Sequence, residues 1–190
     1  HLYHYAGNNP VRYVDPDGRT PGVSMNLVPP GNPNGTEREQ NDYKLNLGFN
    51  SVNTSWGQMT IAIHGNKYGV YINHVQISVD DFAEMIRNNP RYAEAKQEAK
   101  IKGKPMEIIL LACNTGKELG NGDKIFGQQL VDALADKDVI VKAPDKYIHP
   151  VRYDSFGPGY ELSSDGVISS RDDVEPRRLK VFTYKPQQEE

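Results

Sequence analysis

The chain has 190 residues, a net charge of −3 and a mean hydropathy of −0.68. This length suits one domain with a hydrophobic core, and the weak negative charge argues against a nucleic-acid-binding protein. No apolar run approaches the roughly 20 residues of a membrane-spanning helix, and the first residues lack the pattern of a signal peptide. The single cysteine excludes a disulfide framework and a cysteine-rich zinc site, and we expect neither a metal nor a cofactor.

Residues 1–36 are rich in Pro, Gly and Asn, which predicts turns and irregular chain. We expect this segment to end in a linker, with one domain over residues 37–190 whose last part, 147–190, is β-rich. "NNPVRYVDPDG" resembles the end of the core of Rhs/YD-repeat proteins, where a variable toxin domain follows. The residues that carry this resemblance are Tyr3, Tyr5, Asn8, Asn9, Pro10, Tyr13, Asp15, Pro16, Asp17 and Gly18.

Alternating strands and helices are predicted between residues 37 and 146, from the apolar periodicity and the turn residues that separate the elements. This order predicts an α/β fold with a mainly parallel sheet and helices on both faces. A β-hairpin and an edge strand are expected near the C-terminus. The expected strands are 42–49, 57–65, 106–113, 139–144 and 177–186, with 69–78 as a further alternating segment that acts as a hairpin partner. A hairpin is expected over 159–170, and helices over 78–89, 91–103 and 122–138.

Two predicted strands end in residues with useful chemistry, His64 and Cys113. In a parallel sheet, ligands bind beyond the carboxyl ends of the strands, so both side chains are expected at one edge. The separation, 113 − 64 = 49 residues, leaves room for a hairpin and a helical segment between neighbouring strands. A nearby imidazole can take the proton of a thiol and later protonate a leaving amine, which is the minimum for thiolate catalysis.

The residues around the pair suit the same chemistry. Gly65 allows close approach of substrate, and its N–H together with that of Cys113 is suited to bind an oxyanion. Asn114 opens a polar turn and is a candidate for the substrate pocket. Asp145 ends a strand, where it either forms a turn after proline or lines a pocket for a basic side chain.

A structural interpretation remains open beside this one. A lone cysteine at a strand end is often a small buried hydrophobe, and a lone histidine there is often structural. His74 is expected on the face of a hairpin strand. His149 is an alternative base, because it follows the predicted strand 139–144.

The strand ending in His64-Gly65, followed by one ending in Ala112-Cys113, resembles the caspase-hemoglobinase (clan CD) cysteine peptidases. "LLACNTG" looks like the corresponding motif of CHAT domains, and is similar to the self-processing protease domains of large clostridial and MARTX toxins. The separation of His64 and Cys113 is also close to the roughly 50 residues of caspases. The resemblance covers residues 58–146, and implies a caspase-like fold with His64 as base and Cys113 as nucleophile.

Together the two resemblances imply a cysteine endopeptidase toxin of an Rhs-type protein, secreted or delivered into a target cell and acting in its cytoplasm. Its expected partners are a protein substrate, an immunity protein that neutralises it, and the remaining Rhs shell; no nucleic acid and no membrane span are expected. Two alternatives stay open. One is a glutamine deamidase or other acyl-transfer toxin with the same Cys–His chemistry, and the other is a non-catalytic caspase-like binding module.

Overall fold

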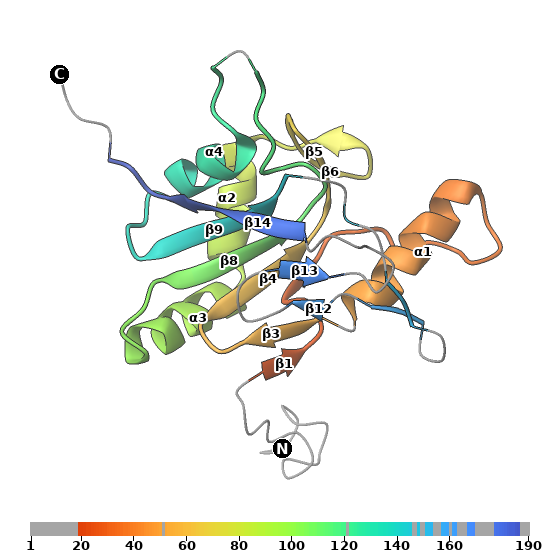
Figure 1. Ribbon diagram of the computed structural model, residues 1–190, viewed down its shortest axis with the longest axis horizontal. Helices are drawn as coiled ribbons and strands as arrows, with labels where there is room; N and C mark the ends of the chain where they lie inside the picture. The colour runs from red at the N-terminus through yellow and green to blue at the C-terminus, as the bar shows by residue number, and fades with distance from the viewer. Residues whose placement is uncertain are drawn as a thin grey trace, which may run out of the picture.

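The computed structural model describes residues 19–50, 52–120, 122–145, 148, 151–153, 157–159, 161–162, 167–169 and 177–186. Its centre is a seven-stranded sheet (Figure 1). In spatial order its strands are β12 (Glu161–Leu162), β13 (Val167–Ser169), β14 (Arg177–Thr183), β9 (Val139–Pro144), β8 (Met106–Leu111), β4 (Gln58–Ala62) and β2 (Met25–Asn26).

The sheet combines a parallel and an antiparallel part. Strands β2, β4, β8 and β9 run parallel to one another, whereas β14, β13 and β12 follow with antiparallel pairings. The α/β class is therefore confirmed, with a mixed sheet whose core strands are parallel. The expectation of an edge strand over 177–186 is wrong, because β14 lies between β9 and β13. Two of its side chains, Leu179 and Phe182, are buried accordingly.

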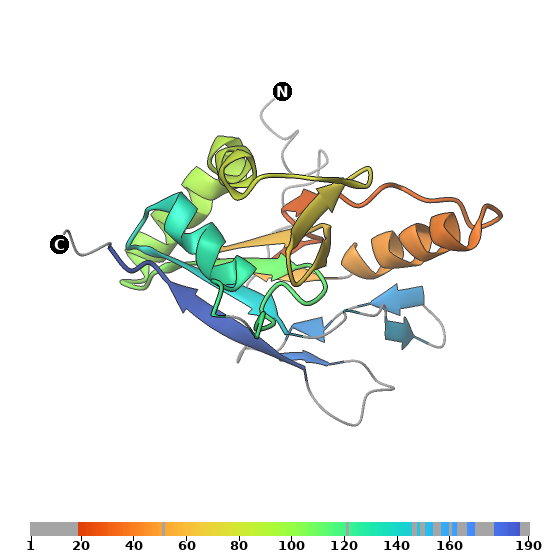
Figure 2. The ribbon, with the colours of Figure 1, turned by 90° about the horizontal axis from the view of Figure 1, so that it is seen from above.

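Four helices flank the described sheet. They are α1 (Glu37–Phe49), α2 (Val79–Asn88), α3 (Pro90–Ile101) and α4 (Phe126–Leu134). Helices α2, α3 and α4 confirm the three predicted helices and gather on one side of the sheet (Figure 2). Helix α1 packs on the other face. None of the described helices combines the length and the apolarity that a bilayer-crossing helix requires.

The parallel strands are buried on both faces, which explains why "MEIILL" is a continuous apolar run. Because successive side chains of a strand point to opposite faces, Ile108 and Leu110 join the cluster under α2, α3 and α4. Ile109 and Leu111 join a second cluster under α1, together with Phe49. One face of the central strand β8 therefore packs under α2, α3 and α4, and the other face packs under α1.

Helix α1 occupies the segment predicted as a strand over 42–49, and that prediction is wrong. Thr36 caps the helix: its side chain accepts from the N–H of Glu39, whose carboxylate in turn accepts from the N–H of Thr36 at 2.7 Å. This reciprocal capping box starts a helix at residue 37. The apolar residues of "DYKLNLGF" alternate as in a strand, but the cap upstream decides the conformation.

Three small antiparallel sheets complete the described chain. They are β1 (Arg19–Pro21) with β3 (Asn53–Ser55), β10 (Val151–Tyr153) with β11 (Gly157–Gly159), and the three-stranded sheet of β5 (His64–Asn66), β6 (Gly69–Ile72) and β7 (Val75–Gln76). The segment 69–78, expected as a hairpin partner, does pair antiparallel with β5 through β6, but a turn divides it into β6 and β7. The expected hairpin 159–170 is confirmed as β12–β13.

The expected N-terminal linker contributes two short strands, since β1 and β2 both fall within residues 1–36. Strand β2 is part of the main sheet, where Met25 pairs with Ile61. The Rhs-like motif lies in residues 1–18, outside the described residues. The boundary after residue 36 stays a prediction.

Helix α3 is tied to the β3–β4 turn by a partly buried ion pair. Arg91 donates two hydrogen bonds, of 2.8 and 2.7 Å, to the Glu98 carboxylate, which also accepts from the Gly57 N–H at 2.7 Å. Burial alone would raise the pKa of Glu98, but the hydrogen bonds from Arg91 and Gly57 outweigh it and lower the pKa below its usual value. The pair therefore contributes stability above the pKa of the unfolded chain and loses it as the pH falls through the folded-state pKa.

We predict that Glu98→Gln lowers the free energy of unfolding by about 1–3 kcal/mol at neutral pH, because it weakens a charge-assisted contact of low exposure. The deficit shrinks as the pH falls through the lowered folded-state pKa of Glu98, where the wild-type carboxyl becomes protonated too. Urea denaturation at several pH values measures this. Glu94→Gln is the matched control: Glu94 lies 3.6 Å from Arg91 with 66% of its side chain exposed, and its loss should cost less than about 0.5 kcal/mol. Equal losses in the two variants would contradict the prediction.

Candidate functional site

The register between β4 and β8 brings the two predicted catalytic residues to neighbouring positions. The pairing runs from Gln58 opposite Glu107 to Ala62 opposite Leu111, and the Ile63 N–H continues it with a 3.3 Å hydrogen bond to the Leu111 carbonyl. Beyond these strands His64 opens β5 and Cys113 opens the turn after β8, and a Cβ at Gly65 would lie 3.4 Å from the Cys113 carbonyl oxygen. Both residues therefore lie at the carboxyl edge of the sheet, next to one another.

His64 and Cys113 also point to the same face of the sheet. Cys113 packs against the cluster that contains Ile109 and Leu111, the residues that precede it on the same side of β8. On the neighbouring strand Ala62 belongs to this cluster, and His64 contacts helix α1, which covers the same face. The imidazole and the thiol therefore share one edge and one face.

A buried carboxylate holds the imidazole. Nε2 of His64 lies 2.7 Å from Oδ1 of Asp42 on α1, and Asp42 is only 5% exposed. An ionised carboxylate only accepts hydrogen bonds, so Nε2 carries the proton and Nδ1 of the neutral ring keeps its lone pair. The His64 side chain is 32% exposed, which leaves the ring accessible to a substrate. Asp42 thus sets the orientation of the ring and leaves Nδ1 as the ring nitrogen outside this contact.

The thiol of Cys113 is half-buried beside Ile148. The Ile148 N–H approaches Sγ at 3.4 Å, and Sγ lies 3.9 Å from the Ile148 carbonyl oxygen. The thiol donates to this carbonyl and accepts from the N–H, so two backbone groups of Ile148 hold the sulfur in position. The chain beyond β9 therefore passes against the sulfur while leaving it partly exposed.

The turn after Cys113 is tightly anchored. Asn114 adopts a left-handed backbone conformation with φ of 58°, and the Thr115 hydroxyl donates to the Ala112 carbonyl at 2.8 Å. The Gly116 N–H donates to the Pro144 carbonyl at 2.7 Å, and a Cβ at Gly116 would lie 2.5 Å from the Ala143 carbonyl oxygen. Only glycine fits this approach to β9, so the turn fixes the position of the cysteine.

Gly65 lies against the turn that follows Cys113. A Cβ at Gly65 would come within 2.9 Å of both the Ala112 Cβ and the Thr115 Cγ2, so this contact also requires glycine. In β6 the Val70 carbonyl accepts from the Ile77 N–H at 3.1 Å and so points towards β7. Gly65 and Val70 are therefore a non-hydrogen-bonded pair, and the Gly65 N–H points away from β6.

The other predicted residues lie in different surroundings. Asn114 is 7% exposed and shapes the turn, and Asp145 is partly buried just beyond β9. Neither lines the cavity beside His64. His74 is not on a strand face as expected, because it sits in the β6–β7 turn with φ of 72°. His149 lies outside the described residues.

Comparison with known proteins gives a family but no activity. A family model described as "Domain of unknown function (DUF8616)" matches residues 23–158. The chain belongs to the DUF8616 family. The matched region contains Asp42, His64 and Cys113, so the whole candidate site lies inside the family domain. No curated protein matches the chain.

Sequence reasoning missed Asp42 in this DUF8616 domain because it assigned the residue to a strand. The signal that would have found it is "TERE" at residues 36–39, a capping-box pattern that starts a helix. On that helix Asp42 is buried, although its neighbours in sequence are polar. A buried carboxylate without a hydrogen-bonding partner is costly, so it points to a cation or donor such as His64.

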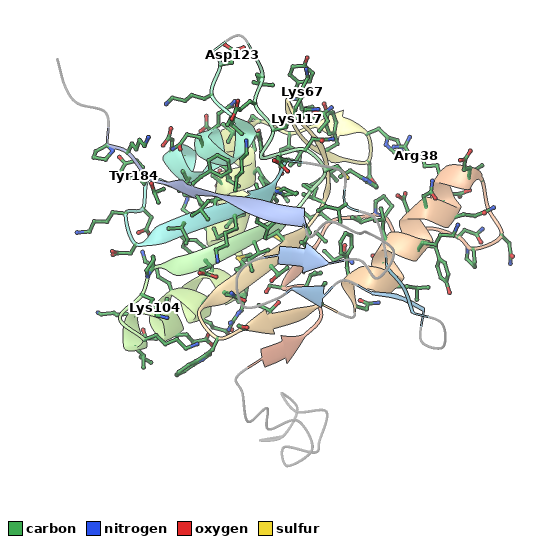
Figure 3. All side chains as sticks on the ribbon, in the orientation of Figure 1. Arg38, Lys67, Lys104, Lys117, Asp123 and Tyr184 are labelled. Carbon is green, nitrogen blue, oxygen red and sulfur yellow. The ribbon has the colours of Figure 1, made fainter. Side chains whose placement is uncertain are left out.

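Apart from the cavity beside His64, the DUF8616 domain has another cavity, which lies away from the candidate site. Its volume is about 590 Å³, and Figure 3 shows one of its residues, Lys104, at the end of the molecule opposite Arg38. It is lined by Lys96, Ala99, Lys100, Gly103, Lys104, Pro105, Lys137 and Asp138. Within the described ranges, no group of three or more His, Cys, Asp or Glu side chains could hold a metal ion.

We predict that Cys113 of the native chain reacts with iodoacetamide at neutral pH, and that His64→Gln and Asp42→Asn each slow this reaction about tenfold. The reason is that a correctly oriented imidazole increases the thiolate fraction of a neighbouring cysteine. Mass spectrometry of the intact chain over time gives the rates.

Asp80→Asn is the control for this experiment, since Asp80 is an exposed residue in the first turn of α2. It should leave the alkylation rate unchanged. An unchanged rate in His64→Gln would mean that the imidazole does not act on the thiol.

Proposed function

We propose that the chain is a cysteine endopeptidase of caspase-like fold, with Cys113 as nucleophile, His64 as general base and Asp42 as the residue that positions His64. The observation that supports the proposal is the hydrogen bond of His64 to a buried carboxylate, since the neighbouring Gly65 lies against the turn that Cys113 opens. A histidine with only a structural role does not need this arrangement beside a partly exposed thiol.

The first half of the reaction forms a thioester. Nδ1 of His64 takes the proton of the Cys113 thiol, and the thiolate attacks the carbonyl carbon of the scissile peptide bond. The carbonyl electron pair moves onto oxygen. As the tetrahedral intermediate collapses, the carbon–nitrogen bond breaks and His64 returns the proton to the leaving amine.

The second half restores the enzyme. Water replaces the amine, His64 takes its proton, and the hydroxide attacks the thioester carbon, so that the acid product leaves and the thiol is reprotonated. In both halves the negative oxygen needs hydrogen-bond donors. The N–H of Gly65, which points away from β6, and the N–H of Cys113 are proposed for this role. Asp42 stabilises the imidazolium that forms by accepting its Nε2–H.

The biological setting of the proposal rests on the Rhs-like motif. The motif precedes the DUF8616 domain, in the place where Rhs-type proteins carry a toxin. The chain would then be delivered into a target cell, cleave a protein in the cytoplasm, and be neutralised in the producing cell by an immunity protein.

We predict that cells expressing the 190-residue chain accumulate new protein N-termini, and that Cys113→Ala lowers their formation by about a thousandfold or more, because the nucleophile is lost. N-terminal proteomics measures the termini. Asp80→Asn serves as the matched control and should cleave as the wild-type chain does. Cleavage that survives in Cys113→Ala would refute the proposal.

The same samples separate the two enzyme functions. A deamidase would convert glutamine to glutamate by the same thioester route, and would give a shift of about 1 Da on glutamine without new termini. If neither change depends on Cys113, the non-catalytic binding module is the remaining interpretation.

A further inference from the structure

Thr115 is a fully buried polar residue in the turn that follows Cys113. Its hydroxyl donates to the Ala112 carbonyl at 2.8 Å, a bond to the residue three positions earlier that threonine often forms. The Thr115 carbonyl in turn accepts from the Gly127 N–H, at the start of α4, at 3.0 Å. Contacts at both its side chain and its backbone therefore fix Thr115 between the end of β8 and helix α4.

The hydroxyl of Thr115 acts on the peptide group just before the candidate nucleophile. The Ala112 carbonyl and the Cys113 N–H belong to one planar peptide unit, so a contact that holds the oxygen also fixes the direction of the N–H. This N–H is one of the two groups proposed above for the oxyanion. A hydrogen bond to the carbonyl also polarises the peptide unit and strengthens its N–H as a donor.

The methyl group of Thr115 reaches the other proposed donor. Cγ2 would lie only 2.9 Å from a Cβ at Gly65, so the methyl group packs against the residue that follows His64. A β-branched side chain is stiff about χ1, which ties the hydroxyl and the methyl group to one another. The relative position of the Cys113 and Gly65 N–H groups is therefore set through one side chain.

The turn has a further anchor that does not involve this hydroxyl. The Gly116 N–H donates to the Pro144 carbonyl at 2.7 Å, which holds the turn against β9. Loss of the Thr115 hydroxyl should therefore leave the path of the chain in place and release mainly the peptide unit between Ala112 and Cys113.

We propose that Thr115 is a positioning residue for the oxyanion site: its hydroxyl aligns the Cys113 N–H, and its methyl group sets the place of Gly65. This inference rests on the proposed peptidase function and adds a residue to the same site. Thr115 acts through the two backbone donors and does not touch the substrate.

The test compares two reactions of Cys113 in the 190-residue chain. With p-nitrophenyl acetate, His64 takes the thiol proton and the thiolate adds to the ester carbonyl, whose oxygen becomes negative. The carbon–oxygen bond then breaks, p-nitrophenolate leaves with the electron pair, and the acetyl group stays on Sγ. With iodoacetamide, the thiolate displaces iodide and no oxyanion forms. Absorbance of p-nitrophenolate and mass spectrometry of the intact chain give the two rates.

Thr115→Val keeps the shape of the side chain and removes the hydroxyl. We expect it to lower the acetylation rate about tenfold or more, because one oxyanion donor is misaligned. The iodoacetamide rate should stay within about twofold, because it depends on the thiolate alone. Thr115→Ser retains the hydroxyl and should restore acetylation to within about threefold of the wild-type rate.

Thr54→Val is the matched control. Thr54 is also buried, and its hydroxyl donates to the Gly22 carbonyl at 3.0 Å, but it lies in β3 outside the candidate site. Its loss should leave both rates unchanged, with urea denaturation showing that all variants are folded under the assay conditions. An unchanged acetylation rate in Thr115→Val, or an equal fall in both reactions, would overturn the inference.

Protein cleavage in cells separates this inference from the proposed function. Acetylation that depends on the Thr115 hydroxyl, together with new protein termini that depend on Cys113, supports both. The same acetylation result in a chain that cleaves no protein would refute the peptidase and keep the role of Thr115 in acyl transfer. Cleavage that depends on Cys113, with no effect of Thr115→Val on acetylation, would keep the peptidase and refute the role of Thr115.

Discussion

The parallel pairing of β4 with β8 is the constraint on which the site depends. A register shift of one residue would turn either His64 or Cys113 to the opposite face of the sheet, because side chains alternate along a strand. The register is held by apolar side chains buried on both faces and by a turn after Cys113 that only glycine at residue 116 can make. Core packing therefore fixes the ends of β4 and β8, from which the chain continues to His64 and Cys113.

Helix α1 covers the second face of the sheet and provides the hydrogen-bond partner of His64. The second face of the sheet is closed by Phe49 near the end of α1, while Asp42, two turns earlier, reaches the edge where His64 lies. Burying Asp42 is favourable only with a donor, and His64 is that donor, so the helix and the strand end stabilise each other. The same contact selects the tautomer of the ring, which links the packing of α1 to the chemistry at Nδ1.

The sequence predicted the α/β class and three of the four described helices, because strong apolar runs and caps such as Ser78 mark these elements. It failed for α1, where an alternating apolar pattern outweighed a capping box, and consequently it missed Asp42. It also misjudged β14 as an edge strand, since nothing in a strand's own residues reveals that β13 will pair beside it. Local sequence signals predicted the elements whose contacts lie close together in the sequence. They failed for contacts between distant segments.

The chain segment between His64 and α2 forms one wall of the cavity beside His64. A direct connection from β4 to a helix would leave the edge beside His64 open, whereas the β5–β6–β7 sheet builds a wall there and faces α1 across the cavity. Because Arg38 and Asp42 lie on one face of α1, any movement of that helix would displace the cation of the cavity and the partner of the base together. The positions of Arg38 and of the His64 ring are thereby coupled through one helix.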